Sequence, residues 1–96
     1  MKTLANMNDT EILLNEFRNQ IDSIDREIIY LLSRRFNLVS SIWDVKKQNN
    51  IEALQPWRWN EVLEKLDESC NEFWVDSELV KNIWDLIHLH SLKIEK

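Results

Sequence analysis

Six polar side chains stand in or beside apolar positions of the sequence, or at the start of an expected helix. They are Arg18, Arg35, Lys46, Arg58, Ser91 and Glu95. A charge placed among apolar side chains costs free energy unless a partner neutralises it. Arginine grips a carboxylate through two parallel hydrogen bonds, so converging cations suit a ligand that carries two carboxylates. We therefore expect these residues to build a pocket for a small dianionic substrate.

The alternative is that each cation forms an ordinary ion pair with an acid of the same chain. Asp22 and Asp25 lie within reach of Arg18 and Arg26 on the same helix. For any single arginine this structural pairing is the better interpretation. For Arg18, Arg35, Lys46 and Arg58 taken together, the ligand pocket is the better one.

Arg35 occupies the vacant place in an apolar seam of heptad spacing. The seam consists of Leu14, Phe17, Ile21, Ile24, Ile28, Leu31, Leu38, Ile42 and Val45. Lys46 lies 11 residues after Arg35, which at about 100° per residue is a rotation of three turns and about 20°. Both cations are therefore expected on one helix face, about 16 Å apart along the axis.

The seam predicts one long helix over residues 9–47, because nothing in that range breaks a helix. At about 1.5 Å per residue such a helix extends ~58 Å. A compact domain of this length has a radius of gyration of only ~13 Å. The far end of the helix therefore needs apolar cover from elsewhere, and a second copy of the chain is the simplest source. We expect an intertwined, two-fold homodimer.

Two more helices are expected, and they complete an all-α fold of one long, one short and one medium helix. Pro56 suits a first helical position and predicts a helix over residues 56–71, and Asp76 is a good N-cap for a third helix. The inward positions are expected to be Trp59, Val62, Leu63, Leu66, Cys70, Val80, Ile83, Trp84, Ile87, Ser91 and Ile94. We expect residues 1–8 to fray and residues 9–96 to form a single domain.

The composition excludes several classes of function. The 96 residues contain no glycine, which rules out a dinucleotide fingerprint or a phosphate-binding P-loop. A net charge of −5 argues against binding to nucleic acid or to an anionic membrane. No apolar run reaches the length of a membrane span, and the opening MKTLANMNDTE lacks the apolar core of a signal peptide. The lone cysteine and these absences predict a cytoplasmic protein.

The sequence offers no metal site or nucleophile. His88 and His90 are two residues apart, about 200° around a helix, so they cannot share a metal ion. One is expected at the surface and the other packed or capping. Cys70 has no neighbouring motif that would activate its thiol, and we expect it to be a small core residue.

Three motifs make the chain resemble the all-helical (AroQ-type) chorismate mutases, from about residue 14 to residue 95. They are Arg-x-x-Ile-Asp-x-Ile-Asp at residues 18–25, Leu-Leu-x-Arg-Arg at residues 31–35 and Pro-x-Arg at residues 56–58. The resemblance implies a dimer of three-helix chains with two buried active sites. It also implies an isomerase that rearranges chorismate.

The resemblance assigns roles to the same residues that break the apolar pattern. It implies that Arg18 crosses into the partner subunit's site and binds one substrate carboxylate, while Arg35 binds the other. Lys46 and Glu95 would face the ether oxygen of the breaking bond. The resemblance also implies that Arg58 and Ser91 line the pocket.

The chain departs from ordinary mutases beside Arg58. Those enzymes usually carry a glutamate directly after this arginine and often an acid three residues before it, and both address the ring hydroxyl of the substrate. Here the positions hold Trp59 and Gln55. This pattern, together with Glu95, is similar to the branch that rearranges 4-amino-4-deoxychorismate, a precursor of p-aminophenylalanine. Two alternatives stay open, namely an isochorismate-pyruvate lyase that makes salicylate and a non-catalytic helical dimer.

The chemistry implied by the resemblance needs no cofactor. A Claisen rearrangement is pericyclic, so the protein contributes by holding the diaxial conformer and by stabilising negative charge on the ether oxygen. Glu95 donates a hydrogen bond only when it is protonated, a form that burial favours and a nearby Lys46 opposes. We expect activity to fall with rising pH as Glu95 ionises.

Overall fold

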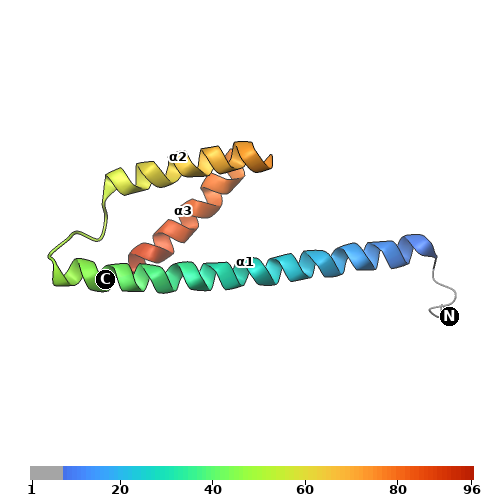
Figure 1. Cartoon of the computed structure of the whole chain (residues 1–96), viewed down its shortest axis with the longest axis horizontal. Coiled ribbons are helices and arrows are strands. Elements are labelled where there is room, and N and C mark those ends of the chain that lie inside the picture. Colours follow the sequence, from blue (N-terminus) through green and yellow to red (C-terminus); the bar gives the residue numbers. More distant parts are fainter. Residues whose placement is uncertain (1–7) are drawn as a thin grey trace. The chain divides into compact units, whose positions relative to one another are not determined.

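The computed structural model describes residues 8–96, and its regular elements are three α-helices (Figure 1). They are α1 (Asp9–Gln48), α2 (Pro56–Phe73) and α3 (Ser77–Ile94). No strand occurs among residues 8–96, so the predicted all-α fold with one long helix is confirmed. Helix α2 continues two residues past the predicted end, and α2 and α3 have the same length of 18 residues.

The contacts within the chain divide it into two compact units. One ends at Arg35 and the other comprises residues 36–96. The first unit contains the N-terminal part of α1. The second contains the last turns of α1 together with α2 and α3, and it holds most of the candidate site residues.

Helix α1 begins with a capped first turn. The Oδ1 atom of Asn8 accepts a hydrogen bond from the backbone N–H of Glu11 at 2.8 Å, which satisfies a donor that the helix leaves unpaired. Asp9 and Glu11 add negative charge at the positive end of the helix dipole. Of the segment 1–8 that we expected to fray, residues 1–7 lie outside the described part of the chain.

The apolar seam of α1 is about half exposed in a single chain. No residue of α1 is buried, and the exposed fractions run from 44% at Leu14 through 52% at Phe17 to 61% at Leu38. Water contact along a continuous apolar stripe is unfavourable, by about 25 cal/mol for each Å². The stripe is therefore a surface that gains stability from being covered.

Helices α2 and α3 pack against each other in the second unit. The Trp59 indole of α2 stacks on the His88 ring of α3, with 4.1 Å between ring centroids. The Lys81 ammonium lies 3.1 Å from the Asp67 carboxylate. Cys70 is buried at 5% exposure, which confirms its predicted place in the core.

The ends of α2 and α3 follow their local sequence. Pro56 opens α2 directly after Gln55, as predicted, although the Gln55 side chain makes no capping hydrogen bond. Trp74 ends α2 in the left-handed conformation, beyond the predicted end because no glycine or proline stops the helix earlier. The predicted N-cap of α3 is confirmed, since Asp76 Oδ2 accepts from the N–H of Leu79 at 3.3 Å.

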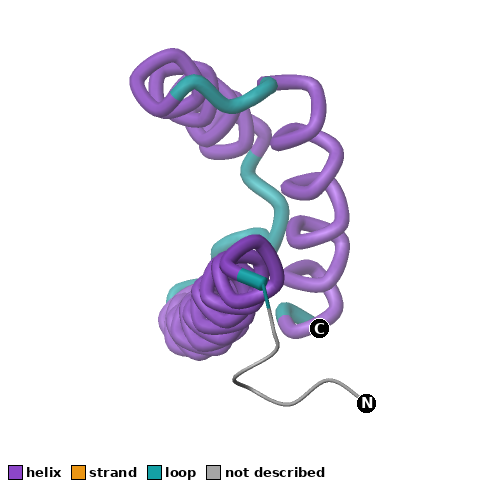
Figure 2. Tube along the Cα trace, turned by 90° about the vertical axis from the view of Figure 1, so that its right-hand side faces the viewer, coloured by secondary structure: helices purple, strands orange, loops and turns teal. Residues whose placement is uncertain are grey.

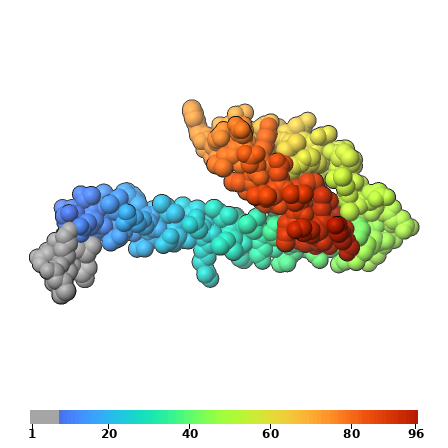
Figure 3. All heavy atoms as spheres, turned by 180° about the vertical axis from the view of Figure 1, so that it is seen from behind, coloured from blue at the N-terminus to red at the C-terminus, as the bar shows by residue number. Residues whose placement is uncertain are grey.

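Helix α3 returns toward the C-terminal end of α1 (Figures 1 and 2). In the space-filling view the last residues of α3 lie against the last turns of α1 (Figure 3). The rings of Phe36 and His90 meet edge to face, with 4.6 Å between centroids. Ile87 and Ser91 are the buried residues of α3, and this face is the one that we predicted to point inward. The exception is Ile83, which is 43% exposed.

Candidate active site

A largely buried ion pair joins α1 to the end of α3. The Nζ atom of Lys46 lies 3.2 Å from Oε2 of Glu95, and the two side chains are only 12% and 9% exposed. Lys46 lies in the last turn of α1 and Glu95 is the C-cap residue of α3. The structure thus brings together the two residues that were expected to face one reacting atom.

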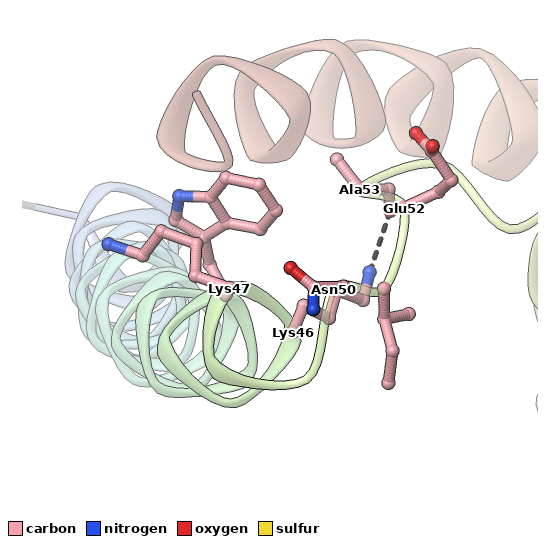
Figure 4. A pocket seen from close by; sticks show the side chains of 7 residues that line it. Lys46, Lys47, Asn50, Glu52 and Ala53 are labelled. Carbon is pink, nitrogen blue, oxygen red and sulfur yellow. Dashed lines mark hydrogen bonds between the residues drawn. The ribbon is translucent and has the colours of Figure 1, made fainter.

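The loop after α1 supplies a second partner for Lys46. Its Nζ donates a hydrogen bond to the backbone carbonyl of Ala53 at 2.6 Å, which is the dashed line in Figure 4. An ammonium has three N–H donors, and Glu95 and Ala53 accept two of them. Among the described residues no third acceptor is found for Lys46. The side chain of this largely buried cation is thus held by one carboxylate and one backbone carbonyl.

Ser91 and Glu95 are the buried polar residues of the second unit. The Ser91 hydroxyl donates to the carbonyl of Ile87 at 2.9 Å, and the backbone N–H of Glu95 donates to the Ser91 carbonyl at 3.1 Å. Residues four apart lie on the same side of a helix. The predicted placement of Ser91 in a core position, with Glu95 one turn later, is confirmed.

Arg58 takes a different position from the one expected. Its Nη1 is hydrogen-bonded to Oε1 of Glu61, one turn further along α2, and its side chain is 53% exposed. An exposed pair of this kind contributes little stability. Arg58 therefore lies in solvent, paired with an acid of its own helix.

The two residues that set this chain apart from ordinary mutases flank Arg58. Gln55 is the half-buried residue before α2, and Trp59 is half-buried against His88 with the ring planes 17° apart. Trp59 therefore belongs to the contact between α2 and α3. His88 is half-buried in this stack, whereas His90 is exposed although its ring meets Phe36, so the expectation of one packed and one surface histidine is confirmed.

Arg18 and Arg35 belong to the first unit. Arg18 is exposed and Arg35 is half-buried. The other six predicted site residues, Lys46, Gln55, Arg58, Trp59, Ser91 and Glu95, belong to the second unit. Within that unit the structure brings Lys46 and Glu95 into contact.

The expectation that the cations lack acidic partners in their own chain is wrong for two of them. Lys46 pairs with Glu95, and Arg58 pairs with Glu61. The helical period did not reveal that α3 returns to this end of α1, because a pairing across 49 residues depends on tertiary packing.

Sequence reasoning missed the contribution of the loop after α1. Asn50 adopts a left-handed backbone with φ of 55°, and the loop then brings Ala53 to Lys46 (Figure 4). The signal that was available is the Asn-Asn pair at the end of the helix, since asparagine is the residue after glycine that most readily ends a helix in this conformation.

No group of three or more histidine, cysteine, aspartate or glutamate side chains among residues 8–96 is arranged to hold a metal. No described helix combines the length and apolar character that crossing a bilayer requires.

Comparisons with known proteins point to one family. A family model described as "Chorismate mutase type II" matches residues 17–96. The "Chorismate mutase" of Methanocaldococcus jannaschii is 28% identical over 83 residues, which cover 86% of this chain and 84% of that protein. The "T-protein" of Haemophilus influenzae is 30% identical over 73% of this chain. The "Bifunctional chorismate mutase/prephenate dehydratase" of Aquifex aeolicus is 40% identical over 55% of it.

The fraction of the relative's own length that this chain matches differs from one relative to another. The match covers most of the Methanocaldococcus protein but only 19% of the Haemophilus protein and 15% of the Aquifex protein. No solved structure matches the chain.

Proposed function

We propose that this chain, which belongs to the chorismate mutase type II family, catalyses the Claisen rearrangement of chorismate or of 4-amino-4-deoxychorismate. The product is prephenate or its 4-amino analogue. One observation carries the proposal: Lys46 and Glu95 meet at 3.2 Å in a place where both are largely hidden from water.

The reaction suits this pair. The ether C–O bond breaks while a C–C bond forms between the two ends of the substrate, and negative charge builds on the ether oxygen. A fixed donor aimed at that oxygen lowers the barrier, and its effect is larger where water is excluded. Lys46 supplies such a donor through the N–H that neither Ala53 nor Glu95 accepts. No external nucleophile, metal or cofactor enters this step.

Glu95 supplies a second group at the same oxygen. In its protonated form it donates a hydrogen bond to the ether oxygen, and in its ionised form it holds the Lys46 ammonium. The 4-amino substrate tolerates an anionic Glu95 better than the hydroxyl-bearing one, because a ring amine can carry positive charge. This argument, together with Gln55 and Trp59 at positions where other mutases carry acids, favours the amino substrate.

The substrate carboxylates require arginines. We assign one carboxylate to Arg35 and the other to the partner subunit's Arg18, with Arg58 lining the pocket near the start of α2. The exposed pair between Arg58 and Glu61 is easily exchanged, because its net contribution to stability is small. Arg58 can therefore turn to a carboxylate of the substrate.

The site as proposed is completed by a second copy of the chain. The apolar seam of α1 leaves Phe17 52%, Ile21 55%, Ile24 54% and Ile28 51% exposed, and covering it by a two-fold partner would bury a continuous stripe. Arg18 lies beside Phe17 on the same helix. A partner packed on the seam is thus placed next to Arg18, in a homodimer that we assign to the cytoplasm.

The direct test is to incubate the pure protein separately with chorismate, with 4-amino-4-deoxychorismate and with isochorismate, and to identify the products by NMR. We expect rearrangement of one or both of the first two. Salicylate and pyruvate from isochorismate would instead support the lyase alternative. Turnover of none of the three would leave a non-catalytic helical dimer. Lys46→Ala, with the exposed Lys47→Ala as the matched control, shows whether any turnover uses this site.

A further inference from the structure

Lys46 is held at both its backbone and its side chain by the same short loop. Its carbonyl accepts hydrogen bonds from the N–H groups of Asn49 at 3.2 Å and Ile51 at 2.9 Å. Its Nζ donates to the carbonyl of Ala53 at 2.6 Å. The loop that follows Gln48 is therefore tied to the Lys46 carbonyl, and it returns to the tip of the same side chain (Figure 4).

This return depends on the backbone of Asn50. With φ at 55° it is one of the two residues in the described chain with positive φ, and the other is Trp74 at the end of α2. The bond from the Ile51 N–H to the Lys46 carbonyl spans five residues, and such a bond closes a helix end only when the residue before the donor is left-handed. Asparagine tolerates that conformation, whereas a β-branched residue does not.

We propose that Asn50 is a positioning residue for Lys46: its left-handed turn delivers the Ala53 carbonyl that aims the ammonium. The inference rests on the proposed function, in which the remaining N–H of Lys46 points at the ether oxygen. With the Ala53 carbonyl in place, the ammonium is held between two acceptors, Ala53 and Glu95. Without it, Lys46 is held by Glu95 alone and swings with that side chain. A misplacement of about 1 Å can cost about 100-fold in rate.

The kinetic test compares substitutions that differ in their tolerance of positive φ. Asn50→Gly keeps the left-handed turn, and we expect kcat within about twofold of the wild type. Asn50→Val disfavours the turn, and we expect kcat to fall by about 10- to 100-fold while KM changes less than about threefold. Asn49→Val is the matched control, because it removes a side-chain bond to the Val45 carbonyl at a position without positive φ, and its kcat should stay near that of the wild type.

A second readout does not depend on turnover. In protein labelled with ¹⁵N-lysine, the Lys46 ammonium, assigned with Lys46→Arg, should exchange slowly with water in the wild type and in Asn50→Gly. It should exchange much faster in Asn50→Val. If the Lys46 signal is the same in Asn50→Val as in the wild type, the positioning role is wrong, whether or not the protein is a mutase. If the signal changes as expected while no substrate is rearranged, the proposed function fails and the positioning of Lys46 by Asn50 stands.

The fold of each variant is checked by circular dichroism and thermal unfolding. If Asn50→Val does not fold, Asn50→Ala carries the same test, because alanine also disfavours the left-handed region but lacks the branch at Cβ. Loss of kcat that is equal in Asn50→Gly and in the valine or alanine variant would also overturn the inference, since it would assign the effect to the asparagine side chain.

Discussion

The Lys46 ammonium and the Glu95 carboxylate form a 3.2 Å ion pair across 49 residues of sequence, with side chains that are 12% and 9% exposed. Removing one partner of a buried pair leaves the other charge without compensation, whereas removing both is tolerated better. The pair is thus coupled to stability as well as to the proposed chemistry, and the two effects can be separated by experiment.

Lys46→Ala is expected to lower kcat by about 100- to 1,000-fold, the loss seen when a donor to a developing oxyanion is removed. It should also lower the free energy of unfolding by about 3 kcal/mol, because Glu95 is left buried without its cation. Steady-state kinetics and urea unfolding measure the two effects. Lys46→Ala combined with Glu95→Gln should recover part of the stability and none of the activity. Recovery of activity in the double variant would contradict the role of Lys46.

Glu95→Gln tests whether position 95 needs a charge or only a hydrogen-bonding group. A glutamine amide keeps a donor for the ether oxygen and an acceptor for the Lys46 ammonium, so we expect kcat to stay within about tenfold of the wild type. Glu95→Ala removes both groups and should lower kcat by about 100-fold or more. Steady-state kinetics measures both variants. Equal losses in the two variants would contradict a hydrogen-bonding role of Glu95 at the ether oxygen.

Mixing two inactive variants tests whether the sites are shared between subunits. A chain with Arg18→Ala and a chain with Lys46→Ala, refolded together in equal amounts, form hybrid dimers in which one of the two sites contains both native residues. Half of the dimers are hybrids, so about a quarter of the wild-type activity should return in a two-fold assembly. Each variant refolded alone is the control. No recovery, with dimers confirmed by light scattering, would place Arg18 and Lys46 of the same chain in one site.

The stack of Trp59 on His88 predicts a stability effect. Trp59→Ala removes a half-buried indole between α2 and α3, and we expect a loss of about 2 kcal/mol, below the 3–5 kcal/mol of a fully buried aromatic residue. His88→Phe keeps a ring in the stack and should cost less than about 1 kcal/mol. Urea unfolding followed by tryptophan fluorescence gives both values. A loss for His88→Phe as large as that for Trp59→Ala would contradict this prediction, because a phenyl ring at position 88 keeps the covered area of the stack.

Much of the fold follows from local sequence physics. The three- and four-residue spacing of the α1 seam, Pro56 after Gln55 and the Asp76 cap each act within a few residues, and they correctly predicted three helices and most of their ends. The end of α2 was harder to predict. It depends on Trp74 adopting a left-handed conformation that its residue type does not favour.

The candidate site, like the fold, was predictable from the sequence only in part. Residue types and helical spacing alone singled out Lys46, Ser91 and Glu95 as polar groups in apolar places, because burial follows the 3.6-residue period. Only the tertiary structure decided that Glu95 meets Lys46 and that the loop after α1 brings Ala53 to the ammonium. These contacts depend on the path of α3 and of one loop in space, and the period of a helix carries no information about where its neighbours run.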